Sequence, residues 1–135
     1  MNVQKILVAG FVQLNDKVLL LKQSKSFFEN GAEKWEPVLT EVEFGQSPNE
    51  AITKAIENQT GIKVVSGQLI SKFFNQIVRK ENDSVQLIII GFKCSPVNKE
   101  TALSKANASL KWFNANELKY VNACPQVKEL LQGFA

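Results

Sequence analysis

The sequence predicts an α/β layered domain in which a mixed β-sheet lies between helices. Apolar segments separated by polar turns predict two β-hairpins, a sharply capped segment in the middle predicts a helix, and apolar residues at helical spacing recur near the C-terminus. The chain has 135 residues, of which 44% are hydrophobic and 21% are charged. These proportions are typical of a globular protein with one hydrophobic core, so we expect residues 1–135 to form a single domain.

The first part of the chain predicts a hairpin, a loop and a further strand. Residues 3–14 are rich in apolar and small residues, a two-residue polar turn follows, and residues 17–23 contain the apolar run of a buried strand. Residues 24–34 show no clear period, which predicts an exposed loop. Residues 35–43 resume an extended pattern, so a third strand is expected there.

The clearest helix signal begins at Ser47. Ser47 can act as the N-cap, Pro48 suits the first helical turn because its missing N–H has no partner there, and Glu50 stands three residues after the cap. Apolar residues then follow at helical spacing, and Gly61 is suited to the left-handed conformation that ends many helices. These signals predict a helix over residues 48–60.

The second part of the chain predicts another hairpin, a short strand and a final helix. Residues 63–78 and 84–94 have the composition of two long strands joined by a polar turn. Residues 109–113 predict a short strand, and residues 114–120 a brief helical turn. Residues 125–134 carry Val127, Leu130, Leu131 and Phe134 at helical spacing, which predicts a terminal helix.

The composition excludes several classes of function. The chain contains no histidine, which rules out Ser-His-Asp and Cys-His catalytic groups and histidine-ligated zinc. Cys94 and Cys124 are too few and too far apart for a disulfide framework, so we expect two reduced thiols without a functional role. The net charge of +3 comes almost wholly from lysines, and Arg79 is the only arginine. We therefore expect no dedicated nucleic-acid binding.

No segment has the pattern of a membrane span or a secretion signal. The longest apolar stretches, such as residues 85–92, are far shorter than the roughly 20 residues that a membrane helix needs. Residues 1–7 mix polar and apolar residues and lack a basic segment followed by an apolar one. We expect a cytoplasmic protein that does not bind membranes.

The segments around the central helix resemble those of a known family. Gly45-Gln46-Ser47 precedes the helix, Gly61-Ile62 follows it, and the order of the predicted elements on both sides resembles the Nudix hydrolase family over essentially the whole chain. The resemblance implies a Nudix-type α/β/α sandwich with a mixed β-sheet. It also implies a site at the helix where glutamates hold Mg²⁺ or Mn²⁺ and help to activate water against a diphosphate linkage.

The residues that would carry this chemistry differ from the family motif. With Gly61 in its motif position, the other motif positions, in order a glycine, a glutamate, an arginine and three glutamates, hold Thr40, Gln46, Lys54, Ala55, Asn58 and Gln59. Three amides and an alanine thus replace four acids, which makes the Nudix box degenerate. Amide oxygens bring no negative charge and take no proton from water, so we expect little or no classical hydrolysis and no metal cofactor.

Other residues are candidates for a remaining site. Glu41 and Glu43 precede the helix and are weak candidates for one metal site. Trp35 is a candidate ligand-binding residue because its family counterpart precedes the catalytic loop, and Gln23 stands where many relatives carry an arginine near the cleft. Glu43 is also a candidate for ligand binding.

The aromatic side chains add further candidates. Phe27 and Phe28 lie in the polar loop, where they predict a lid or a contact surface, and Phe28 is a candidate for ligand binding. Phe73 and Phe74 are adjacent in a predicted strand and face opposite ways, so at most one of them can line a given cleft.

Three functions are consistent with these observations. The first is a sensor or regulatory module that binds a nucleotide or another diphosphate-containing small molecule without hydrolysing it. The second is a divergent metal-dependent hydrolase of nucleoside diphosphate derivatives, with Mg²⁺ or Mn²⁺ held by Glu41, Glu43 or acids from later strands such as Glu81 and Asp83. The third is a protein-interaction domain or homodimer in which Phe27, Phe28 and the apolar strands form the contact surface.

Overall fold

The computed structural model describes residues 1–65 and 67–134, without the side chains of residues 70–74, 76, 80, 133 and 134. The aromatic side chains of Phe73, Phe74 and Phe134, which the sequence patterns single out, therefore lie outside the described residues. Within the described part of the chain, no helix is long and apolar enough to cross a membrane.

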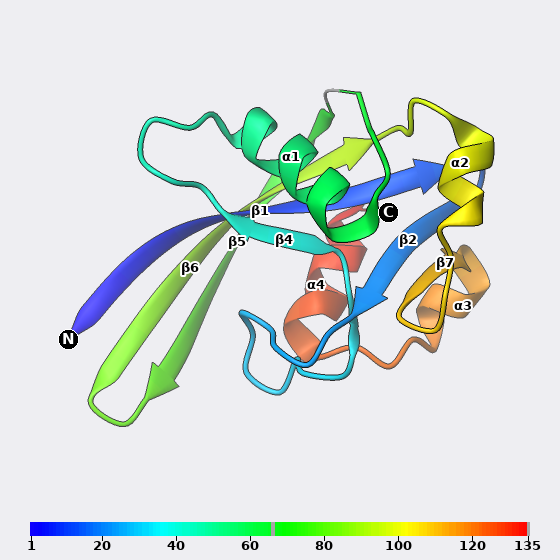
Figure 1. Cartoon of the computed structure of the whole chain (residues 1–135). Helices are drawn as coiled ribbons and strands as arrows, with labels where there is room; N and C mark the ends of the chain where they lie inside the picture. The colour runs from blue at the N-terminus through cyan, green and yellow to red at the C-terminus, as the bar shows by residue number, and fades with distance from the viewer. Residues whose placement is uncertain (66, 135) are drawn as a thin grey trace.

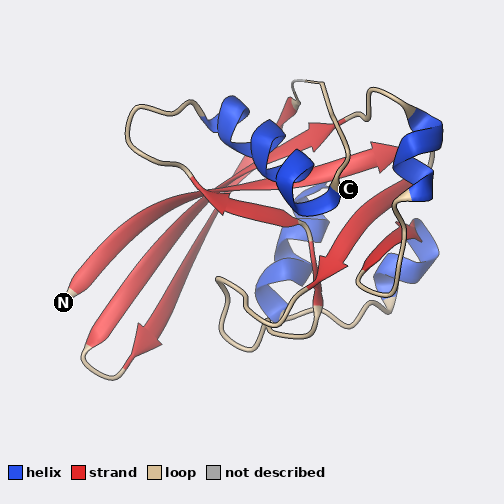
Figure 2. Cartoon of the chain, in the orientation of Figure 1, coloured by secondary structure: helices blue, strands red, loops and turns tan. Residues whose placement is uncertain are grey.

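The fold is a mixed sheet with helices on both faces, as the sequence predicts (Figures 1 and 2). The strands are β1 (Asn2–Leu14), β2 (Lys17–Lys22), β3 (Trp35–Glu36), β4 (Val38–Glu41), β5 (Gln68–Lys80), β6 (Asp83–Cys94) and β7 (Leu110–Asn114). The helices are α1 (Pro48–Thr60), α2 (Lys99–Ser104), α3 (Ala115–Lys119) and α4 (Pro125–Phe134). The strand order is β3-β2-β1-β6-β5, with β4 paired to β1 and β7 paired to β2. Only β1 and β6 run parallel.

Strand β1 forms the centre of the molecule because its two faces belong to two different hydrophobic cores. Val8 and Val12 face α1 and pack with Ile52. Leu7 and Phe11 point to the opposite face, where α4 covers the sheet. Alternate residues of a strand face opposite ways, so an uninterrupted apolar run such as residues 6–12 is what a strand covered on both faces requires. Figure 1 shows α1 and α4 on the two sides of the sheet.

The central helix has the bounds that its sequence predicts. The Ser47 hydroxyl accepts a hydrogen bond from the Glu50 backbone N–H at 3.2 Å, and Pro48 occupies the first turn. Gly61 ends the helix with a φ of 76°, the left-handed conformation that glycine adopts without steric cost. The sequence signals at the two ends are therefore sufficient to define α1.

The predicted strand over residues 35–43 is wrong in one respect, because Pro37 divides it. Proline has no backbone N–H and cannot continue a ladder on both sides. Before Pro37, β3 pairs with β2, and after it β4 pairs with β1. The chain therefore crosses from one part of the sheet to another at this point, and the divided strand forms one wall of the site described below.

Two further elements differ from the sequence expectations. Strand β5 begins at Gln68 and not at residue 63, since Val64 forms only an isolated bridge with Pro96. Helix α2 was not predicted, although the Asn98 side chain caps it by accepting from the Thr101 N–H at 2.9 Å. At six residues, α2 is too short to show a periodic pattern in the sequence.

We predict that Gly10→Ala destabilises the protein, because Gly10 lets β1 and α1 approach closely. A Cβ atom at Gly10 would lie 2.7 Å from Ile52 Cγ1 and 2.9 Å from Ile56 Cδ1, and both side chains are fully buried. Overpacking of this kind costs about 1–3 kcal/mol. Urea denaturation should show this loss for Gly10→Ala and almost none for Lys54→Ala on the exposed side of α1. Equal midpoints for the two variants would contradict the packing argument.

Candidate functional site

A cleft lies where the C-terminal end of α1 meets β4 and the loop after β2, and it is called the α1 cleft below. It has a volume of about 330 Å³. Its walls are Gln23, Lys25, Ser26, Phe27, Glu36, Leu39, Thr40 and Gln59. The predicted residues Gln23, Thr40 and Gln59 therefore come together in one place, although 36 residues of sequence separate the first from the last.

The amides at two of the motif positions hydrogen-bond to the backbone. Gln59 Nε2 donates to the Leu39 carbonyl oxygen at 3.2 Å, which ties the last turn of α1 to β4. A carbonyl oxygen only accepts, so the nitrogen of the Gln59 amide must face it. Gln46 Oε1 accepts from the Glu43 backbone N–H at 3.3 Å and so closes the loop before α1. Only the Gln59 contact lies at the α1 cleft, because Gln46 does not line it.

The remaining motif positions do not converge on the cleft. Ala55 is buried in the core under α1, whereas Lys54 and Asn58 are exposed on the helix and line no part of the α1 cleft. Glu50 and Glu57 lie with Lys54 around a separate, shallow depression on the outer side of the helix. The carboxylates of α1 are thus directed away from the α1 cleft.

Glu36 is a buried carboxyl group in the cleft that the sequence analysis missed. Its side chain is only 3% exposed, and the Ser26 hydroxyl donates to Glu36 Oε2 at 2.7 Å. Burial raises the pKa of Glu36 to about 7, although the Ser26 hydrogen bond lowers it in part. The one sequence signal was a glutamate within a short apolar strand, which is an unusual place for a charge.

The acidic residues predicted as weak metal ligands lie elsewhere. Glu41 forms an ion pair with Lys5 at 3.7 Å on the surface of β4, and Glu43 is exposed and lines neither the α1 cleft nor the pocket beside Trp35. Among the described residues, no three His, Cys, Asp or Glu side chains are grouped so that they could hold a metal. The α1 cleft offers one carboxylate and several neutral oxygens, which is fewer charged metal ligands than the family resemblance implies.

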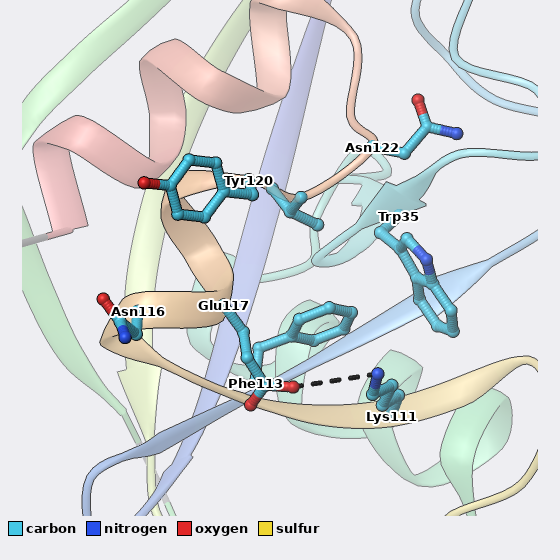
Figure 3. A pocket seen from close by; sticks show the side chains of 8 residues that line it. Trp35, Lys111, Phe113, Asn116, Glu117, Tyr120 and Asn122 are labelled. Atoms are coloured by element: carbon cyan, nitrogen blue, oxygen red, sulfur yellow. Dashed lines mark ion pairs between the residues drawn. The ribbon is translucent and has the colours of Figure 1, made fainter.

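Trp35 faces a different pocket, on the other side of β3 from Glu36. This pocket of about 470 Å³ is lined by Trp35, Lys111, Phe113, Asn116, Glu117, Tyr120, Val121 and Asn122 (Figure 3). The Trp35 and Phe113 rings meet edge to face, with their centroids 5.1 Å apart. Lys111 lies over the Phe113 ring and pairs with Glu117 at 3.7 Å. The predicted ligand-binding residues Trp35 and Gln23 therefore do not belong to one site.

The prediction for Phe28 is wrong. Phe28 is 4% exposed and belongs to the core under α4, so its ring neither lines the α1 cleft nor forms a lid or contact surface. The neighbouring Phe27 is 38% exposed and does line the cleft. The burial of Phe28 could not be predicted from the sequence, because one buried aromatic residue among the eleven residues of a polar loop makes no periodic pattern.

The cysteines have the buried positions that unreactive thiols occupy. Cys94 and Cys124 are both about 1% exposed. Burial raises the pKa of the Cys94 thiol to about 11 and raises that of Cys124 as well. A thiol is nucleophilic mainly as the thiolate, so neither residue is activated for chemistry.

We predict that ionisation of Glu36 destabilises the folded protein. The raised pKa means that the folded state holds this proton more tightly than the unfolded state, so the free energy of unfolding falls as the pH rises from about 4.5 through about 7. A shift of this size corresponds to about 3 kcal/mol.

Denaturation of Glu36→Gln and of the unmodified protein across this pH range measures the effect. The variant should gain stability relative to the unmodified protein as the pH rises. A constant difference between the two proteins would mean that the Glu36 pKa is not raised.

Known proteins with a similar fold are Nudix proteins. A NUDIX hydrolase from Nitrosomonas europaea superposes with a TM-score of 0.71 at 18% identity, over 97% of this chain and 88% of that one. A MutT NUDIX hydrolase from Burkholderia pseudomallei gives 0.74 at 14% identity, over 98% of both chains. A UDP-X diphosphatase gives 0.68 at 22% identity, over 96% of this chain and 60% of that one. At such identities these structures establish the fold alone.

The sequence itself matches a family model. No curated protein sequence matches the chain. The family model for the NUDIX domain matches residues 4–134, which is nearly the whole chain. The shared fold and this match lead to the same assignment, and the chain belongs to the Nudix family.

Proposed function

We propose that this Nudix domain binds a nucleotide or another diphosphate-containing ligand in the α1 cleft and acts as a sensor or regulatory module with little or no metal-dependent hydrolysis. The hydrogen bond from Gln59 to the Leu39 carbonyl carries this proposal. A glutamate at position 59 would place a carboxylate against the Leu39 carbonyl oxygen. Two acceptors cannot hydrogen-bond to each other directly, so a donor such as water, or a cation, would have to lie between them. With an amide, the same two elements are joined without a metal.

The side chains that line the α1 cleft support ligand binding. Lys25 supplies a positive charge at the wall, Thr40 and Gln23 supply neutral hydrogen-bonding groups, and the exposed part of Phe27 supplies an apolar surface. Such a mixture of an apolar wall and a few polar groups is typical of small-molecule sites. A protein named UDP-X diphosphatase shares this fold, and we therefore include UDP derivatives among the ligands to be tested.

We predict measurable binding without turnover. Calorimetric titration with nucleotide sugars, dinucleotides and nucleoside triphosphates should give at least one ligand that binds below millimolar concentration. The same ligands, incubated with Mg²⁺ or Mn²⁺, should release no phosphate or nucleoside monophosphate above the rate without protein. Absence of binding across the panel at millimolar concentration would refute the proposal.

We also predict that Gln59→Glu makes the stability of the protein depend on a metal. Loss of the hydrogen bond to Leu39, with an acceptor left facing an acceptor, should cost about 1–3 kcal/mol. Millimolar Mn²⁺ should recover part of this loss in Gln59→Glu and leave the unmodified protein unchanged. Ala106→Glu, which adds the same charge at an exposed position outside the motif, is the matched control and should do neither.

A variant Gln59→Glu that is as stable as the unmodified protein in the absence of metal would contradict this account. It would show that the contact between α1 and β4 does not depend on the amide. Thermal denaturation with and without Mn²⁺, followed by circular dichroism, is sufficient to decide.

A divergent hydrolase is the second candidate, and the position of Glu36 favours it. A carboxyl group with a pKa of about 7 inside the cleft is suited to act as a general base near neutral pH. In this case turnover should depend on added metal and disappear in Glu36→Gln. If the essential group is a metal held by Glu43, and not the Glu36 carboxyl group, Glu43→Gln should abolish turnover and Glu36→Gln should only reduce it.

A further inference from the structure

Glu36 has no counter-ion among the described side chains. The ion pairs of the described residues involve Asp83, Glu41 and Glu117, and none involves Glu36. Its side chain accepts a hydrogen bond from the neutral Ser26 hydroxyl. A buried carboxylate in this state is costly unless a positive charge or several donors face it.

The described side chains around Glu36 include no cation that pairs with its carboxylate. Lys25 lines the same cleft but is exposed, and Lys22 lies over the Trp35 ring at 5.2 Å, on the far side of β3. The Cys124 thiol is also near, since the Glu36 charge helps to raise its pKa while Lys34 lowers it. From α1 only the neutral Gln59 faces the cleft, and from the end of β2 only the neutral Gln23.

Gln23 is the decisive position. It borders the same cleft as Glu36, and it stands where the family resemblance places an arginine. Gln23 and Glu36 line the same cleft of about 330 Å³, and Gln23 brings no charge to it. With glutamine, the cleft retains a buried acid and lacks the built-in cation.

We propose that Glu36 receives a guanidine-type group of the ligand, meaning two adjacent N–H donors or a delocalised positive charge, so that the ligand supplies the counter-ion that the protein lacks. The inference rests on the proposed function, because it assigns the orientation of the ligand in the same α1 cleft. It places the donor edge of the ligand at Glu36 and any phosphate toward Lys25. A phosphate beside Glu36 would meet a buried like charge, which opposes binding.

This arrangement couples binding to a proton. N–H donors favour the ionised form of Glu36, so the affinity for such a ligand rises with pH and binding below neutrality releases a proton. With a free pKa of about 7, the affinity should increase about tenfold between about pH 6 and about pH 8. An anion at Glu36 would give the opposite slope.

Three probes distinguish which chemical group of a ligand binds at Glu36. Guanosine monophosphate carries the N–H pair on a base, agmatine carries it on an alkyl chain, and inorganic pyrophosphate carries none. Calorimetry in two buffers with different ionisation enthalpies measures the affinity and the protons released at each pH. The full chain is used throughout.

Three variants test the role of Glu36. Glu36→Gln keeps an oxygen for the Ser26 hydroxyl and should fold, and it should abolish both the pH slope and the proton release. Gln23→Arg should supply an internal cation, remove the slope and weaken agmatine at least tenfold at neutral pH. Glu29→Gln, an exposed position in the same loop, is the matched control and should match the unmodified protein.

The outcomes are distinguishable. Binding of guanosine monophosphate or agmatine supports the inference if the affinity has the expected pH slope and the slope is lost in Glu36→Gln. Binding of agmatine alone would also support the inference, but it would contradict nucleotide binding as the proposed function. Nucleotide binding that is independent of pH, or that weakens as pH rises, overturns the inference and leaves the proposed function intact. If no probe and no nucleotide binds, both fail.

Discussion

The hydrogen bond between the Gln59 amide and the Leu39 carbonyl oxygen holds the end of α1 against β4, and the geometry of the α1 cleft depends on it. Helix α1 already packs on β1 through Gly10, but this packing acts near the middle of the helix. The Gln59 contact fixes the last turn, and with it the position of the wall opposite Glu36. The contact between α1 and β4 at this point is thus a direct hydrogen bond between protein groups.

Neutral side chains stand at most of the motif positions, and this determines the chemistry of the α1 cleft. The amide at position 46 accepts from a backbone N–H on the surface, and the amide at position 59 donates to a backbone carbonyl oxygen in a partly buried contact, and neither brings a charge. Glu36 is the exception, since it remains buried while the neutral Gln23 stands beside the same cleft. Burial raises the pKa of Glu36, and carboxyl groups with raised pKa values are common at binding and catalytic sites.

The sequence predicts the fold better than it predicts the site, for physical reasons. The bounds of α1 follow from Ser47, Pro48 and Gly61 because caps act locally and need no tertiary context. The division of one strand at Pro37 could have been inferred from the missing N–H, whereas the burial of Phe28 could not, since it depends on a core assembled from distant segments. Gln23, Thr40 and Gln59 were found by family resemblance. Glu36 was missed because burial, and not its place in a motif, makes it unusual.

The burial of Phe28 has a consequence for how a ligand meets the α1 cleft. The loop over residues 23–34 forms one wall, and the Phe28 ring anchors the middle of that loop in the core. The Ser26 hydroxyl adds a second anchor by accepting from the Phe28 N–H at 3.1 Å while it donates to Glu36. An arriving molecule therefore finds a wall that is already ordered, and little conformational entropy is lost on association. Affinity in such a preorganised site is governed by the match of charges and donors.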